Sequence, residues 1–206
     1  MGRFRIVKVR KKRSTVGPMI AIGIGAAVLV GLFGYAVYQG NGKAAKPTEK
    51  TEQNDPNCWH SPVKLNMDGL ERASCTSNQH VADGTKVLYE TDPPTSGQHY
   101  GAWLPPGFYT TPQTSERLVH DLEHGNIVIY YNKARLSDAD MAELKALTSR
   151  FAKDFQGVLA VPRADATNPV IVTAWETTLR LQTYDKAKVE QFVDAFRGRG
   201  PERLVR

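Results

Sequence analysis

Two histidines four residues apart could together hold a metal ion. His120 and His124 enclose the segment Asp121-Leu122-Glu123. In a helix, side chains at positions i and i+4 lie on one face, so two imidazoles at this spacing can reach one ion. Glu123 could be a third ligand, could orient a ligand, or could act as a base. The segment therefore predicts a metal site, with two hydrogen-bonded histidines near a core as the alternative.

The histidines are concentrated in one part of the chain. Four of the five lie within 45 residues: His80, His99, His120 and His124. Pro93 and Pro94 restrict two φ angles to about −65°, and Gly97 is typical of a turn, so we expect His99 on a stiff loop. Imidazole ligation suits Zn(II) or Cu(II). We predict a Zn or Cu site made of these four histidines and Glu123, while a solvent-exposed role for His99 stays open.

Several short motifs lie between about residues 57 and 196. They are His80-Val81, Pro93-Pro94-Thr95-Ser96-Gly97-Gln98-His99, His120-Asp121-Leu122-Glu123-His124-Gly125 and Thr173-Ala174-Trp175. In these motifs the chain resembles the family catalogued as domain of unknown function 3105. The resemblance implies a membrane-anchored extracytoplasmic protein and favours treating the four histidines as one site. It implies no reaction.

The positive charge of the chain lies at its N-terminus. The formal net charge is +6, but residues 1–13 contain seven Lys and Arg and no acidic residue. Removing these seven from the 27 basic residues leaves 20 against 21 acidic residues, a net charge of −1. The rest of the chain is close to neutral, so its charge indicates no nucleic-acid partner.

Residues 18–38 predict a transmembrane helix. These 21 residues carry no charge, and a helix of that length spans the ~30 Å hydrocarbon layer. Because the positive charges precede it, we expect residues 1–17 in the cytoplasm and the rest of the chain outside. A cleaved signal peptide is the alternative, although its apolar region usually has only about 7 to 15 residues. The chain is expected to be a single-pass protein of the cell membrane.

One folded domain is expected beyond the membrane span. Residues 39–56 are polar and lack an apolar period, which predicts a disordered linker. Residues 57–198 are long enough for one domain with its own core, and residues 199–206 form a basic tail. Near the outer membrane face, other envelope proteins are candidate partners.

The two cysteines, Cys58 and Cys75, fall on the predicted outer side of the membrane. Disulfides persist in oxidising compartments, so we expect a bridge between Cys58 and Cys75. In the chain-entropy account it would stabilise the domain by roughly 3 kcal/mol. Thiolate ligation of a metal is the alternative, but the chain has no Cys-x-x-Cys motif.

The second half of the chain has the clearer secondary-structure pattern. We expect strands at 127–131 and 157–162, and a longer strand or a hairpin over 169–181 that turns near Glu176-Thr177. Helices are expected at 138–152, capped by Ser137, and at 185–196. Earlier, short strands are expected at 86–89 and 103–104.

This order of elements predicts the fold class. It indicates an α+β fold, a small mixed or antiparallel sheet with helices on one side, preceded by a loop-rich segment and one N-terminal transmembrane helix.

Several enzyme classes are excluded by missing motifs. The chain has no Gly-x-Gly-x-x-Gly, no phosphate-binding loop and no Gly-x-Ser-x-Gly. In zinc peptidases a glutamate directly follows the first histidine, whereas Asp121 does so here and is a candidate base. Two functions remain open: a metal-binding domain, enzymatic or not, and a tethered envelope interaction module without metal or catalysis.

The membrane orientation can be tested with reporter fusions. A reporter that requires export should be active when fused after Arg206, because the positive charges hold the N-terminus inside. The same reporter fused after Gly17, before the apolar segment, should be inactive. Activity of a cytoplasm-only reporter after Arg206 would contradict this orientation.

Overall fold

The structure, a computed structural model, describes residues 59–74, 76–165 and 167–202. The expected membrane span at 18–38, the linker and the Cys58–Cys75 bridge lie outside these residues and stay predictions. Within the described ranges, no helix has both the length and the apolar character needed to cross a membrane. All described residues belong to one unit, Lys50–Arg206.

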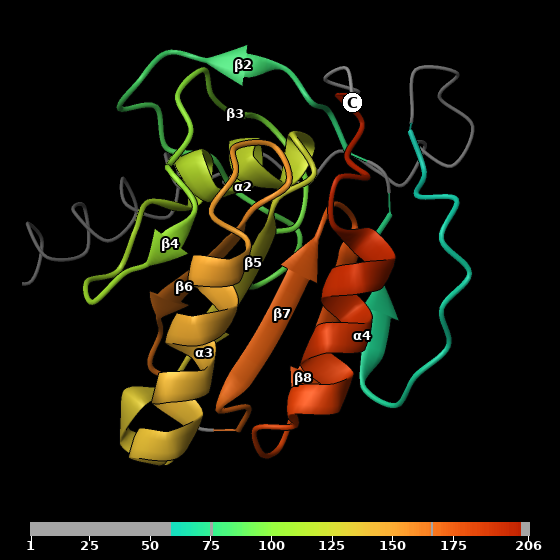
Figure 1. The fold of residues 1–206 in the computed structure, drawn as a ribbon. Helices are drawn as coiled ribbons and strands as arrows, with labels where there is room; N and C mark the ends of the chain where they lie inside the picture. The colour runs from blue at the N-terminus through green and yellow to red at the C-terminus, as the bar shows by residue number, and fades with distance from the viewer. Residues whose placement is uncertain (1–58, 75, 166, 203–206) are drawn as a thin grey trace, which may run out of the picture. The chain divides into compact units, whose positions relative to one another are not determined.

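A six-stranded mixed sheet forms the centre of this unit (Figure 1). In spatial order its strands are β1 (Leu70–Arg72), β8 (Thr177–Leu181), β7 (Val170–Ala174), β5 (Ile127–Tyr131), β6 (Val158–Pro162) and β4 (Gly107–Phe108). Strand β5 pairs parallel with β6 and antiparallel with β7. Every residue of β5 and of β7 is buried, so both faces of the sheet must be covered.

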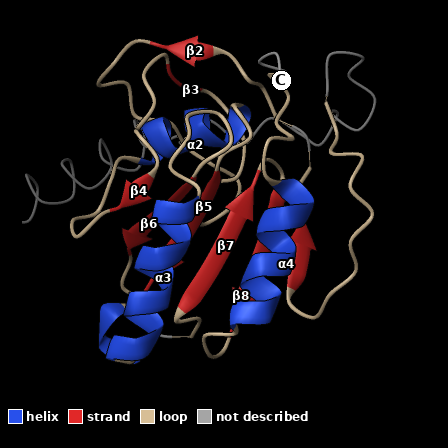
Figure 2. Cartoon of the chain, viewed as in Figure 1, coloured by secondary structure: helices blue, strands red, loops and turns tan. Residues whose placement is uncertain are grey.

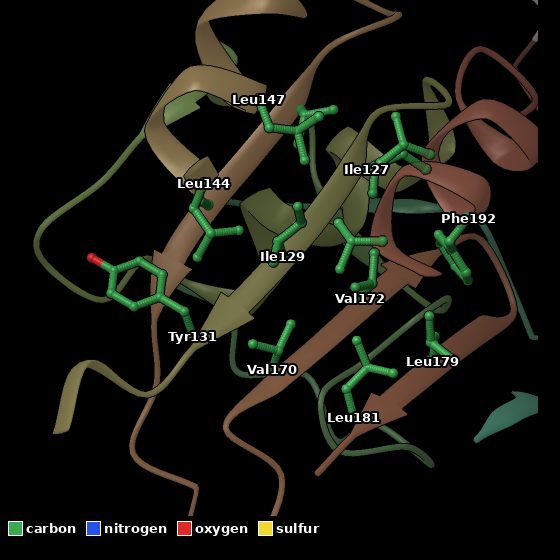
Figure 3. Packing of buried hydrophobic residues seen from close by; sticks show 14 of the residues in the cluster. Ile127, Ile129, Tyr131, Leu144, Leu147, Val170, Val172, Leu179, Leu181 and Phe192 are labelled. Atoms are coloured by element: carbon green, nitrogen blue, oxygen red, sulfur yellow. The ribbon is translucent and has the colours of Figure 1, made fainter. Parts of the chain in front are cut away.

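Two helices cover one face of the sheet: α3 (Asp138–Arg150) and α4 (Lys186–Phe196). Ile127 and Ile129 of β5 point to this face and pack with Leu144 of α3 and Phe192 of α4 (Figure 3). These side chains are almost completely buried. Their removal from water is the main source of stability on this face.

The helix that carries the histidine pair, α2 (Ser115–Glu123), lies on the opposite face. Val128 and Tyr130 of β5 alternate with the residues that face α3 and α4, so they point the other way. They pack with Leu118 and Leu122 of α2. The α+β class with a mixed sheet is confirmed, but the prediction of helices on one side is wrong for α2, because β5 is apolar on both faces.

The elements of the second half follow the sequence pattern. Helix α3 begins after Ser137, whose hydroxyl accepts a hydrogen bond from the Asp140 amide while the Asp140 carboxylate accepts from the Ser137 amide. A short 3-10 helix, η2 (Lys133–Arg135), precedes it. Strands β7 and β8 form the expected hairpin, with Trp175 and Glu176 in its turn.

The described residues before α2 are mostly loop (Figure 2). The strands expected at 86–89 and 103–104 are absent, and β4 forms nearby instead. Leu88 is 98% exposed, and the Tyr89 hydroxyl donates to the Gln98 carbonyl. In this loop Tyr89 packs against the cluster around Leu118 and Leu122, and the Val87 amide donates to the Glu116 carboxylate instead of to a strand. A separate parallel pair consists of β2 (His80–Val81) and β3 (His99–Tyr100).

Truncating the buried ring of Phe192 should destabilise the domain strongly. We expect Phe192→Ala to lower the free energy of unfolding by about 3 to 5 kcal/mol, because it deletes a fully buried side chain of the core. Chemical denaturation of the purified protein measures this. Gln191→Ala, at the exposed neighbouring position of α4, should change the value by less than about 0.5 kcal/mol; equal effects would refute the packing described.

Candidate metal centre

His80 and His99 are brought together by strands β2 and β3. His80 lies directly opposite His99 in this parallel pair, so both side chains project from the same side. Their ring centroids are 4.9 Å apart. The His99 side chain is completely buried, whereas 54% of the His80 side chain is exposed. One ring is therefore enclosed by protein and the other borders solvent.

The loop before His99 fixes the orientation of its ring. Residues 93–97 are all buried, and the Gly97 carbonyl accepts a hydrogen bond of 2.8 Å from His99 Nδ1. Gly97 has φ of +120°, and a Cβ there would lie 3.2 Å from the Tyr89 ring. A side chain at position 97 would therefore strain the loop that holds His99.

Helix α2 presents His120 to the same place. The centroid of its ring lies 4.8 Å from that of His80 and 5.0 Å from that of His99. His120 Nε2 also lies 2.8 Å from His124 Nε2, as the spacing of four residues predicts. The helix ends directly after Glu123, and Gly125 follows with φ of +85°. Three rings thus form a nearly equilateral triangle, with a fourth beside it.

The hydrogen bonds of His99 and His120 define which nitrogen faces the centre. His99 Nδ1 bonds to the Gly97 carbonyl, and His120 Nδ1 bonds to the Tyr100 carbonyl at 2.6 Å. Because a carbonyl oxygen only accepts, both Nδ1 atoms carry protons. In the neutral rings, the Nε2 lone pairs then point inward. Metal-ligating histidines are oriented in this way in proteins.

Glu123 completes this group of possible metal ligands. Its Oε2 lies 2.9 Å from His99 Nε2 and 3.6 Å from His80 Nε2. One donor atom from each of His80, His99, His120 and Glu123 lies within 4.8 Å of the others. Since a carboxylate and a bare imidazole nitrogen are both acceptors, a proton or a metal ion must lie between Glu123 and His99. We call these four residues the inner group.

Burial and the neighbouring imidazoles shift the pKa values of two residues of the inner group, His120 and Glu123. Burial lowers the pKa of His120, so this ring is neutral at neutral pH. Burial by itself raises the pKa of the Glu123 carboxyl. The hydrogen bond to His99 and the nearby imidazoles lower it by a larger amount, so the net pKa lies below its ordinary value. His120 therefore presents a neutral nitrogen and Glu123 a carboxylate, which are the protonation states that bind metals.

A second group shares two residues with the first. His120, Glu123, His124 and Glu202 also place donor atoms within 4.8 Å of one another, and we call them the outer group. Glu202 Oε2 lies 2.7 Å from His124 Nε2. Burial, and then the neighbouring His120, lower the pKa of His124 to about 4. All five predicted ligands thus occur in these two groups, while metal binding itself stays a prediction.

Glu202 was not expected from the sequence. The C-terminal segment folds back over the end of α2, where the Gly198 amide donates to the Gly125 carbonyl at 2.7 Å and the Glu202 amide donates to the Glu123 carbonyl at 3.2 Å. At Gly125 a Cβ would lie 2.8 Å from the Arg199 amide nitrogen. The glycines at 198 and 200 could have indicated this close approach in the sequence. The sequence pattern instead predicts only a basic tail at residues 199–206.

Asp121, the candidate base, belongs to neither group. It accepts hydrogen bonds from the Leu104 amide at 3.1 Å and from Asn126 Nδ2 at 2.9 Å. Burial raises its pKa to about 7 despite these two bonds. The carboxyl group therefore ties two loops to α2, and these contacts do not support a role as a base toward a metal-bound water.

Aromatic rings lie beside the centre. The Trp103 ring lies 5.6 Å from that of His120 and 5.2 Å from that of His124, and the Phe155 ring lies 4.5 Å from His124. Trp175 stands edge-on to His99 at 6.3 Å. Apolar rings beside a site lower the local dielectric constant, which strengthens interactions with a bound ion.

A family model described as "Protein of unknown function (DUF3105)" matches residues 80–206. The chain belongs to this family. The match begins at His80, so it contains every residue of the inner and outer groups. No curated protein and no solved structure matches the chain.

Gly200→Ala should displace the C-terminal segment from α2. The new Cβ would overlap the Glu123 carbonyl oxygen and crowd the Gly125 amide, two backbone groups at the helix end. We expect faster hydrogen exchange in the peptide that contains the Glu202 amide, measured by mass spectrometry. Gly101→Ala is the control, because its Cβ would meet nothing closer than His80 Nδ1 at 3.9 Å. Unchanged exchange in Gly200→Ala would refute the close approach.

Proposed function

We propose that this chain is a membrane-anchored extracytoplasmic protein whose domain binds a transition metal ion through the inner group. The observation that carries the proposal is the triangle of imidazoles beside the buried Glu123 carboxylate, in which His99 and His120 turn Nε2 inward. The anchoring and the location rest on the charge pattern and the apolar segment of residues 1–38.

The donor set favours Zn(II) or Cu(II). Three imidazole nitrogens are borderline ligands that suit these ions, zinc also accepts a carboxylate oxygen, and Cu(I) prefers sulfur. A ligand atom lies about 2.0 to 2.2 Å from zinc, so two ligands of one ion are separated by at most about 4.4 Å. The 4.8 Å span of the inner group is close to this limit. Small side-chain shifts would bring all four atoms to one ion.

Each ligand has a distinct part in this proposal. His99 and His120 are fixed by carbonyl partners, so they form the rigid side of the site. Glu123 supplies a negative charge that partly neutralises a divalent ion. His80 is half exposed and forms the side through which an ion is exchanged with solvent. Metal binding would displace the proton shared by His99 and Glu123, so affinity should fall in acid.

The alternative function is an envelope interaction module without metal. It requires a buried carboxylate and three imidazoles to be kept together only as hydrogen-bonding groups. Burying such groups is costly, and a surface for protein binding does not need them. The exposed Leu88 is a single side chain, which is common on protein surfaces. The inner group therefore favours the metal-binding function.

Metal binding by the purified chain tests this proposal. We expect Zn(II) or Cu(II) to raise the melting temperature, since an ion at 100 times its Kd stabilises the folded state by about 2.7 kcal/mol. His120→Ala should reduce the shift, because it removes one of the four ligands of the inner group. His80→Ala should weaken binding at least about 10-fold without unfolding the protein, because His80 is half exposed.

His60→Ala is the matched control. His60 belongs to neither group and bonds to Glu176 at 3.1 Å, so this variant should bind metal as the natural chain does. If the natural chain retains no metal and neither ion changes its melting temperature, the metal-binding function is refuted and the interaction module takes its place.

A further inference from the structure

The six donor residues are too many and too widely spread for one ion. The inner and outer groups each place their donor atoms within 4.8 Å of one another, but the six do not form a single group. Two ligands of one ion are at most about 4.4 Å apart. We therefore assign His80, in the inner group, and Glu202, in the outer group, to different ions. This step extends the proposed function and rests on it.

The two residues that the groups share differ in what they can do. His120 Nδ1 is bound to the Tyr100 carbonyl, so only one lone pair, on Nε2, is available and only one ion can use it. Glu123 has two carboxylate oxygens, and a carboxylate can bridge two ions about 3.5 to 4 Å apart. Glu123 is therefore the residue that can serve both sites at once.

The position of His120 Nε2 decides which ion it joins. It lies 2.8 Å from His124 Nε2, and two nitrogens that share one ion at about 2.0 to 2.1 Å each are separated by roughly 3 Å. When both sites are filled, the first ion takes His80, His99 and one Glu123 oxygen. The second takes His120, His124, Glu202 and the other Glu123 oxygen.

Hydrogen bonding alone accounts poorly for the outer group. His124 Nε2 faces the lone pair of His120 at 2.8 Å and the Glu202 carboxylate at 2.7 Å. A single N–H on this atom cannot point at both acceptors. His124 Nδ1 is buried and has no hydrogen-bond partner among the described residues. A divalent ion would satisfy His120, His124 and Glu202 together.

Glu202 is held in place by its backbone. Its amide donates to the Glu123 carbonyl, and the Gly198 amide donates to the Gly125 carbonyl. The carboxylate therefore approaches His124 from a segment that is fixed on α2, although 46% of its side chain is exposed. We propose that the chain holds two metal ions bridged by Glu123, the second bound by His120, His124 and Glu202.

The number of Zn(II) ions retained by the purified full chain, counted by native mass spectrometry, tests this inference. We expect two ions per chain. Glu202→Ala and His124→Ala should each retain one, whereas Glu190→Ala, which removes a carboxylate outside both groups, should retain two. Glu202→Ala is the more informative variant, because a half-exposed side chain can be removed without disturbing the core.

The reciprocal variant removes the first ion. His80→Ala should retain one ion, and that ion should be lost when Glu202→Ala is added. In the chain loaded with two Cu(II) ions, the bridged pair should show the broadened electron paramagnetic resonance spectrum of ions about 3.5 to 4 Å apart, and Glu202→Ala should restore a single-ion spectrum.

The outcomes separate this inference from the proposed function. One ion in the natural chain that persists in Glu202→Ala and weakens in His80→Ala refutes the second site and leaves the proposed function standing. One ion that is lost in Glu202→Ala but retained in His80→Ala refutes both the pair of ions and the inner group as the primary site. No ion in any variant refutes the proposed function itself.

Discussion

The contact between the Glu123 carboxylate and His99 Nε2 is the constraint on which the site depends. Both groups are buried, and a carboxylate and an unprotonated imidazole nitrogen are both acceptors, so a proton or a metal ion must lie between them at 2.9 Å. Burying a charged group without such compensation would cost several kcal/mol. The surrounding structure places further possible metal ligands next to this buried pair.

That arrangement draws on segments far apart in the chain. The donors come from β2, β3, α2 and the C-terminal segment, from His80 to Glu202. These segments contribute little to the large core between the sheet and helices α3 and α4. Their positions depend on backbone hydrogen bonds and on the smaller cluster around Leu118 and Leu122. An ion bound here would tie these segments together, so metal binding and local stability are linked.

The sheet explains how α2 is held in place to present His120 and Glu123. Strand β5 is apolar on both faces, and α2 packs on the face that α3 and α4 leave uncovered. Leu118 and Leu122 bury one side of α2, while His120 and His124 occupy another side and face the β2–β3 pair. The hydrophobic face thus fixes the helix, and the polar face is free to supply metal ligands.

Much of the fold follows from local sequence pattern. The capping box at Ser137, the apolar period of α4 and the β-branched run of β5 each act over a few residues, so the second half could be predicted closely. The pairing of His120 with His124 is equally local, since it depends only on the rise and turn of a helix. The membrane span, the linker and the disulfide are sequence predictions of the same kind, and they fall outside the described residues.

Tertiary packing alone decided the rest. Which face of the sheet α2 covers, the turning of Asp121 toward Leu104 and Asn126, and the arrival of Glu202 beside His124 each depend on contacts between distant segments. No local period encodes such contacts, because they are selected by the burial of whole elements against one another. The sequence by itself determined the residue types that could bind a metal, and the packing determined that six of them meet in two overlapping groups around Glu123.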